Sequence, residues 1–268
     1  MPLAPEFITP QDGHQKQDCE TAAAKRWIDQ QAERYRAHQI TLLGDDLYSR
    51  QPLCEHTIAA GLNFIFICKP SSHDTLYQYL HEQGKSSPVM QTLTIERRKG
   101  KRRTIDTYRF ASQLPIRDGD DALMVNWCEL ITTEPDDQVI YHNSFISNHA
   151  INADNVADIV LAGRTRWKVE NENNNILKTK GYHLSHNYGH GKQHLSTLLA
   201  SLNLLAFLFH TIHDMMDIKY QLIRAKLPSR KTFFQHIQAL TCYHCFDSFD
   251  ALLEFMMHGL EIDPLDTG

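Results

Sequence analysis

The sequence lacks a disulfide framework, a targeting segment and an excess of positive charge. Its six cysteines have no regular spacing, and the segment after Met1 has no basic start followed by an apolar run, so we expect reduced thiols in the cytoplasm. The formal net charge of −5 is not the basic balance typical of nucleic-acid-binding domains. With 42% hydrophobic and 22% charged residues, the composition excludes a disordered chain and indicates one or two globular domains.

Charge is also absent from one apolar stretch. Residues 195–212 contain no charged side chain and approach the length of a membrane span. Polar residues interrupt this stretch, and its apolar residues recur at helical spacing. The pattern therefore favours a buried helix of a soluble protein over residues 194–216, and no membrane partner.

The first 88 residues alternate between expected strands and helices. In chain order, beginning with a strand, these elements span residues 1–9, 18–38, 39–44, 51–60, 63–68 and 73–83. The short strands are apolar throughout, as buried strands are, while the helices show amphipathic spacing. This alternation predicts an α/β sheet with parallel strands.

The character of the chain changes near Val89. Residues 89–150 are rich in β-branched and aromatic residues and are broken by turn-forming stretches, which predicts an insertion of antiparallel strands, including 125–132 and 138–145. Helical periodicity returns over residues 151–220. Residues 221–268 are expected to form a looser, amphipathic helical tail.

A cluster of positive charge lies inside the expected insertion. Residues 96–103 read ERRKGKRR. Such a run is either a solvated hairpin tip or a surface that contacts phosphate groups, and the sequence leaves both interpretations open. The candidate phosphate-contacting residues are Lys99, Lys101, Arg102 and Arg103.

Two carboxylates directly follow the expected strand 39–44. Asp45 and Asp46 lie where open α/β sheets place ligands, at the carboxyl end of a strand, and hard divalent cations prefer such oxygen ligands. The alternative is that either residue caps the following turn. The residues alone favour this cap.

A second acidic position lies on the helix expected over residues 154–178. On a helical wheel Glu170 shares a face with apolar residues that must point at the sheet, namely Val156, Ile159, Val160, Gly163 and Trp167. A glutamate on a buried face needs a partner. Arg166, one turn earlier, or a metal ion is that partner, and both interpretations stay open.

Two further patterns are weak metal-ligand signals. One is a lone CxxC pair, and the other is a histidine series within a glycine-rich stretch, which we expect to be a structural or DNA-facing loop rather than a zinc site. The residues concerned are Cys242, Cys245, His183, His186, His190 and His194.

Long motifs connect these positions. Residues 163–192 read GRTRWKVENENNNILKTKGYHLSHNYGHGK, residues 10–27 begin PQDGHQKQDCE, and residues 42–49 read LLGDDLYS. Across residues 1–215 the chain resembles a bacterial branch of the DDE transposases of insertion sequences. Arg166, Glu170 and Lys178 resemble the Tyr-x2-Arg-x3-Glu-x6-Lys signature of that family.

The resemblance implies a ribonuclease-H-like fold, which is a mixed sheet flanked by helices with a β-rich insertion. It implies DNA cleavage and strand transfer with Mg²⁺ or Mn²⁺ held by Asp45 as the second Asp and by Glu170. Arg166 and Lys178 would contact phosphate or orient Glu170. The implied partners are transposon-end and target DNA and a second copy in a homodimer, in the bacterial cytoplasm at the nucleoid.

The chain departs from the family pattern in three ways. Gly163 replaces the Tyr of the signature, Lys178 follows Glu170 with one extra intervening residue, and the first catalytic Asp is expected upstream of Met1. We therefore expect a truncated reading frame whose product alone does not cut DNA. The alternative is a non-catalytic, DNA-binding or dimerising remnant. In either case Asp45 and Glu170 are predicted to lie within about 8 Å of each other, sharing a cation.

Overall fold

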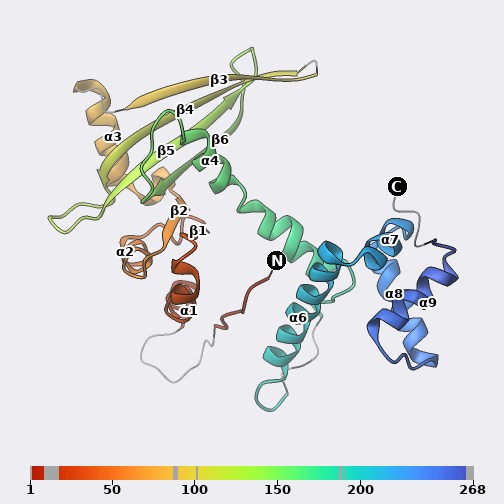
Figure 1. The fold of residues 1–268 in the computed structure, drawn as a ribbon. Coiled ribbons are helices and arrows are strands. Elements are labelled where there is room, and N and C mark those ends of the chain that lie inside the picture. The colour runs from red at the N-terminus through yellow and green to blue at the C-terminus, as the bar shows by residue number, and fades with distance from the viewer. Residues whose placement is uncertain are drawn as a thin grey trace. The chain divides into compact units, whose positions relative to one another are not determined.

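The computed structural model divides the chain into two compact units, and each is described by itself (Figure 1). The α/β unit is Glu6–Trp167, and the helical unit combines Met1–Pro5 with Lys168–Gly268. The structure describes residues 2–8, 18–86, 90–100, 102–186, 189 and 191–263.

A six-stranded sheet, in the order β1-β2-β6-β5-β4-β3, forms the centre of the α/β unit. β1 and β2 are parallel, and every other pair of neighbours is antiparallel. The sheet is therefore mixed. The strands are β1 (Thr41–Gly44), β2 (Asn63–Ile67), β3 (Gln91–Lys99), β4 (Arg102–Pro115), β5 (Met124–Thr133) and β6 (Val139–Ser147).

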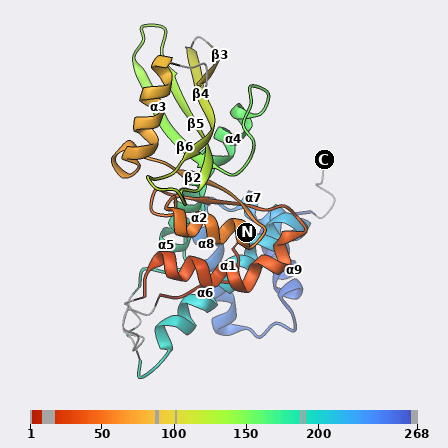
Figure 2. The same cartoon turned by 90° about the vertical axis from the view of Figure 1, so that its left-hand side faces the viewer.

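Helices cover both faces of this sheet, as Figures 1 and 2 show for α3 and α4. Leu76 of α3 packs with Phe66 and Trp127 on one face. Val160 of α4 packs with Phe145 on the other. The expected α/β class, with helices flanking a mixed sheet, is confirmed. The helices of the unit are α1 (Glu20–Arg36), α2 (Gln51–Ala59), α3 (Asp74–Ser86) and α4 (Val156–Arg164), with a 3₁₀ turn at Pro70–Ser72.

The expected antiparallel strands are present, including those predicted at 125–132 and 138–145. They do not form a separate layer, because β6 pairs directly with β2 and so joins β3–β6 to the sheet of β1 and β2. The strand expected over residues 1–9 is wrong for residues 2–8, which form neither strand nor helix.

The helix expected over residues 154–178 is largely present, but a turn and a π-helix interrupt it. α4 ends at Arg164, a turn follows, and a π-helix, Val169–Asn174, precedes the short α5, Asn175–Thr179. π-helical turns bond residue i to i+5 instead of i+4, so they rotate the following side chains relative to an α-helical wheel. The register deduced for Glu170 from such a wheel therefore does not hold.

The helical unit has a packed apolar core. It also contains α6 (Leu195–Met216), α7 (Ile218–Lys226), α8 (Arg230–Tyr243) and α9 (Phe249–Gly259). Tyr220, Ile223, Phe233 and Leu253 are all 0% exposed within this core. The helices predicted over residues 221–268 are present in the described part of this range, but they pack more tightly than the looser tail that was predicted, because their apolar faces converge on one another.

The helix predicted at 194–216 is α6, but its predicted burial is wrong. Phe207 is its only buried residue. By length and composition it is the one helix in the described part of the chain that qualifies as a membrane span.

Candidate active site and nucleic-acid interface

The turn after β1 requires its glycine. A Cβ atom on Gly44 would lie 2.8 Å from both Phe66 Cδ1 and Tyr48 Cβ, which is closer than packed atoms approach. The absence of a side chain lets the chain turn tightly beside β2. This turn places Asp45 and Asp46 at the carboxyl end of β1, as the sequence predicted.

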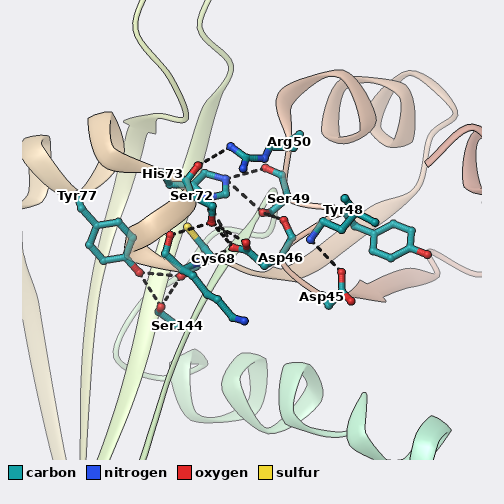
Figure 3. Close-up of polar contacts among 12 residues, drawn as sticks. Asp45, Asp46, Tyr48, Ser49, Arg50, Cys68, Ser72, His73, Tyr77 and Ser144 are labelled. Atoms are coloured by element: carbon teal, nitrogen blue, oxygen red, sulfur yellow. Dashed lines mark hydrogen bonds and ion pairs between the residues drawn. The ribbon is translucent and has the colours of Figure 1, made fainter. Parts of the chain in front are cut away.

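Asp46 has a structural role in this turn. Its carboxylate accepts hydrogen bonds from the Lys69 backbone N–H at 2.7 Å and from Ser72 Oγ at 2.6 Å (Figure 3). Both donors follow β2. Asp46 therefore joins the carboxyl ends of the two parallel strands, and its oxygens are occupied by protein donors. Asp46 therefore does not cap the turn that follows it in sequence, because its partners lie after β2.

Ser49, His73 and Asp46 lie next to one another in this network, as Figure 3 shows. His73 Nε2 lies 3.2 Å from Ser49 Oγ, and His73 Nδ1 lies 3.8 Å from the Asp46 carboxylate. The order resembles that of a hydrolytic triad. However, Ser49 is 0% exposed and its hydroxyl donates to the Asp46 carbonyl at 2.7 Å. No substrate reaches this oxygen, so the contacts stabilise the loop.

Asp45 differs from its neighbour. Its Oδ1 accepts a hydrogen bond from the Leu47 backbone N–H at 2.9 Å, which is the Asx turn expected of a capping aspartate. Its Oδ2 accepts none from the described residues. The side chain is half-buried. Asp45 therefore both caps the turn and keeps one carboxylate oxygen available for a ligand, so the two interpretations of this residue are compatible.

Glu170 lies on the π-helix and is exposed, as is Trp167 before it. The predicted core-facing position of Glu170 is wrong, because the buried face of α4 ends at Gly163. This exposure removes the buried register from which the proximity of Glu170 to Asp45 was predicted, and that proximity stays a prediction. Lys178 on α5 is also exposed, whereas Arg166 is partly buried. The roles of these residues stay predictions.

The carboxylates at the end of β1 provide few free oxygens for a metal ion. Magnesium requires several oxygen ligands in near-octahedral geometry. Within the α/β unit, Asp45 offers one oxygen and the oxygens of Asp46 are occupied. Within the described residues no group of three or more His, Cys, Asp or Glu is arranged to hold a metal ion. The donors at the end of β1 do not by themselves make a complete Mg²⁺ or Mn²⁺ site.

The run ERRKGKRR forms the hairpin between β3 and β4. Arg103 makes an exposed ion pair with Glu96 at 2.8 Å, and Arg102 pairs with Glu134 at 2.7 Å. Lys99 belongs to β3, but its side chain and the whole of Lys101 lie outside the described residues. Within one short run, neighbouring arginines therefore have different surroundings.

Arg97 of this run is held in place by buried groups that sequence analysis missed. Its Nε donates to the Asp106 carboxylate at 2.5 Å and its NH2 to the Tyr108 hydroxyl at 3.2 Å. Thr132 Oγ1 donates to the same carboxylate at 2.7 Å. Asp106 is buried, so its charge is compensated by these donors. The sequence gives no sign of this network because β4 and β5 meet only in the folded sheet.

A groove of about 1070 Å³ lies beside these residues, between the hairpin and α4. Four arginines line it, against two carboxylates, those of Asp106 and Asp158. Arg164 at the end of α4 stacks over the Tyr141 ring, 4.1 Å from its centroid. We call this the arginine groove. Its arginines are Arg97, Arg98, Arg102 and Arg164.

Among the described residues, the cysteines and the histidine series do not gather in a groove as the arginines do. All six cysteines are free. Burial raises the pKa of Cys54 and of Cys128 to about 12, which makes these two thiols poor nucleophiles. Cys242 and Cys245 are exposed. Of the histidine series, His183, His186 and His194 are exposed, and His190 lies outside the described residues.

Comparisons with known proteins do not assign a family. No protein-family model matches the sequence, and no curated protein matches it at the level that would indicate common ancestry. The function is therefore argued from the motifs and from the geometry above.

Proposed function

We propose that this chain is a part of a DDE-type transposase and that its arginine groove holds the phosphate backbone of DNA. The motif resemblance supports the family, and the mixed sheet flanked by helices is compatible with a ribonuclease-H-like fold. The observation that carries the proposal is the gathering of four arginines along one groove of the α/β unit.

The charges of the groove favour a polyanion. Arg98 and Arg164 make no ion pair with a described carboxylate. Arginine presents a planar set of donors that fits phosphate oxygens in pairs. Since Arg97 is fixed by Asp106 and Tyr108, part of this surface is ordered before a ligand binds. The negative net charge of the chain does not oppose this role, because the positive charge is local.

The support for a catalytic role comes from Asp45. Asp45 keeps one oxygen available at the end of β1, and β1 is an edge strand of the described sheet. An edge strand offers unpaired backbone groups to which another strand can add. This supports the hypothesis that a strand carrying a further acid pairs with β1. A Mg²⁺ or Mn²⁺ ion held there would supply Lewis-acid chemistry at phosphorus.

DNA binding tests the groove directly. We expect Arg98→Ala/Arg164→Ala to weaken binding to double-stranded DNA and to reduce the slope of log K against log salt concentration by about 2, one counterion per lost contact. The matched control is Arg34→Ala/Lys226→Ala, which removes two exposed charges elsewhere. Equal weakening by both double variants contradicts the groove, and undetectable binding of the wild type contradicts the proposed function.

Cleavage distinguishes the enzyme from its alternative, a non-catalytic DNA-binding or dimerising remnant. The occupied oxygens of Asp46, which leave only Asp45 with a free carboxylate oxygen at the end of β1, support the remnant for the isolated chain. We expect no cutting of DNA that carries the ends of the parent element, with magnesium or manganese. Cutting that disappears in Glu170→Gln would restore a complete active site. Extending the reading frame upstream and finding an in-frame strand with an Asp would favour the enzyme.

A further inference from the structure

Arg224 of α7 has buried donors without acceptors. Its Nε and Nη1 atoms are buried, and none of the described residues accepts a hydrogen bond from them. The guanidinium lies over the Phe233 ring, with Cζ 5.7 Å from the ring centroid. A ring face attracts a cation but does not replace the oxygen acceptors that buried charged donors need. Arg224 is therefore a desolvated cation whose hydrogen-bonding capacity is unused, and such a group calls for a specific explanation.

Arg230, at the start of α8, adds a second positive charge. Its Nη1 donates to the Tyr182 hydroxyl at 3.3 Å, and its Nη2 lies 4.0 Å from the Asp214 carboxylate, distances longer than those of a close charged pair. The Arg230 side chain is 15% exposed and that of Asp214 is 46% exposed, so the cluster reaches the surface. Burial, followed by the charge of Arg230, lowers the pKa of Arg224, and Asp214 does not offset these two effects. The two arginines are thus close enough to repel each other.

The other groups around the two arginines supply no further negative charge. Burial raises the pKa of the Tyr182 and Tyr220 hydroxyls, so both phenols are neutral near pH 7. Burial, followed by the nearby positive charges, lowers the pKa of His210 to about 4, so its imidazole is neutral as well. Among the described residues whose charges act on Arg224, Asp214 is thus the one anion. Two guanidinium groups share one carboxylate, and the cluster retains a net positive charge.

This arrangement fits a phosphate group better than other ligands. A metal cation is repelled by the net positive charge. A carboxylate has two coplanar oxygens and one charge, which match a single guanidinium group. The two guanidinium groups here belong to different helices, α7 and α8. A phosphate group carries about −1.5 to −2 charges near pH 7 and three acceptor oxygens that point in different directions, so it can accept from both.

We propose that Arg224 and Arg230 bind a dianionic phosphate group at a site formed by α7 and the start of α8. This inference goes beyond DNA binding by the arginine groove and does not depend on it, because both residues belong to the helical unit. Asp214 competes with the ligand, since its carboxylate lies 4.0 Å from Arg230. Free inorganic phosphate and the terminal phosphate of a DNA strand both offer this chemistry.

Titration calorimetry of the full chain with inorganic phosphate tests the site. With the ionic strength held constant by chloride, we expect saturable binding of a single phosphate per chain. Arg224→Gln should raise the Kd at least about 10-fold, because it removes a charged donor group. The matched control, Lys226→Gln, removes an exposed positive charge from the same helix and should leave the Kd unchanged.

Further measurements separate ligand binding from a merely structural role. Asp214→Asn removes the competing carboxylate and should lower the Kd by about threefold, whereas the loss of a structural ion pair would not tighten binding. Arg230→Lys keeps the charge but loses the planar set of donors, and it should raise the Kd about 10-fold. Phosphate should also raise the urea midpoint of the wild type but not that of Arg224→Gln, because a ligand stabilises only the state that binds it.

Single-stranded oligonucleotides with and without a 5′-phosphate identify the source of the group. Tighter binding of the phosphorylated strand, lost in Arg224→Gln, assigns a DNA end, whereas equal binding of both strands together with uptake of inorganic phosphate assigns a free ion; either result supports the site. Two results would overturn it. The first is wild-type protein that neither takes up inorganic phosphate nor prefers the phosphorylated strand, and the second is the same Kd for Arg224→Gln and Lys226→Gln. Failure of duplex DNA to bind the arginine groove would leave the phosphate titration unchanged.

Discussion

Side-chain caps begin three helices of the helical unit and none of α1, α2 and α4 in the α/β unit. The side chains of Asp217, Ser229 and Ser248 accept hydrogen bonds from backbone N–H groups at the starts of α7, α8 and α9. The residues preceding α1, α2 and α4 make no such bond, and neither do those preceding α5 and α6 of the helical unit. A cap is a local signal, whereas packing on a sheet depends on residues far away in sequence. The start of each of these α/β-unit helices therefore depends more on long-range contacts.

The two units also differ in their buried polar and charged side chains. Every buried polar or charged side chain of the described residues lies in the α/β unit, and the most demanding are Asp106 and Glu129. The buried residues of the helical unit are apolar, and the same unit leaves apolar side chains of α6 such as Leu202 and Leu205 exposed. Buried ionic groups need defined partners, whereas apolar groups need only be removed from water. The four predictions below test this contrast, from the largest expected effect to the smallest.

Removing a large side chain from the sheet core should have the largest effect. Trp127 of β5 is 1% exposed and packs with Leu76 of α3, and its Nε1 donates to the Tyr77 hydroxyl. Trp127→Ala is expected to lower the free energy of unfolding by about 4 kcal/mol, because it leaves a cavity. Met215→Ala, at an exposed position, should change it by less than about 0.5 kcal/mol. Urea titration measures both, and a loss below about 1 kcal/mol for Trp127→Ala would contradict the assigned core.

Breaking a buried ion pair should lower the free energy of unfolding nearly as much. Glu129 is 2% exposed and is paired with Arg109 and His142. Arg109→Met leaves this carboxylate with less compensation, and we expect a loss of about 3 kcal/mol in the free energy of unfolding. Arg103→Met breaks the exposed pair with Glu96 and should cost at most about 1 kcal/mol. Equal costs in denaturant titrations would show that burial does not distinguish the two pairs.

The helical unit should lose stability in mild acid through His210. Burial, with Arg230 nearby, lowers the pKa of His210 to about 4, against about 6.5 in the unfolded chain. Between these values the unfolded state binds a proton that the folded state does not, so stability is complete above about pH 6.5 and falls towards pH 4. The loss reaches about 3 kcal/mol.

Replacement of His210 isolates this effect. His210→Phe should flatten the dependence of unfolding free energy on pH between 6.5 and 4, whereas His236→Ala, at an exposed histidine, should leave it unchanged. Parallel pH profiles for wild type and His210→Phe would show that the histidine titrates normally in the fold.

The smallest effect should come from a helix cap. Ser248 Oγ accepts from the Ala251 backbone N–H at 3.0 Å, and Ser248→Ala is expected to cost about 1 kcal/mol. Cys19→Ala, before the uncapped α1, should cost less than about 0.5 kcal/mol. Equal losses of unfolding free energy for the two variants in thermal unfolding would show that the Ser248 cap does not stabilise α9.

Periodicity predicted the elements of residues 18–86 to within a few residues. The strand ahead of Asp45 and the helices on either side of it follow directly from apolar spacing, because spacing is a local property. The candidate site was only partly predictable. Asp46 binds donors near Lys69 and Ser72, and the arginine groove combines the β3–β4 hairpin with Arg164, since these segments meet only after the sheet has formed.

The sequence by itself determined the α/β alternation, the antiparallel strands that follow, the helical character of residues 195–216 and the position of Asp45 at a strand end. Only the tertiary structure decided that the later strands extend the same sheet, that Glu170 lies on an exposed π-helix and that α6 buries Phe207 but not Leu202 or Leu205. The physical reason is that periodicity specifies which residues share a face, whereas burial depends on what packs against that face.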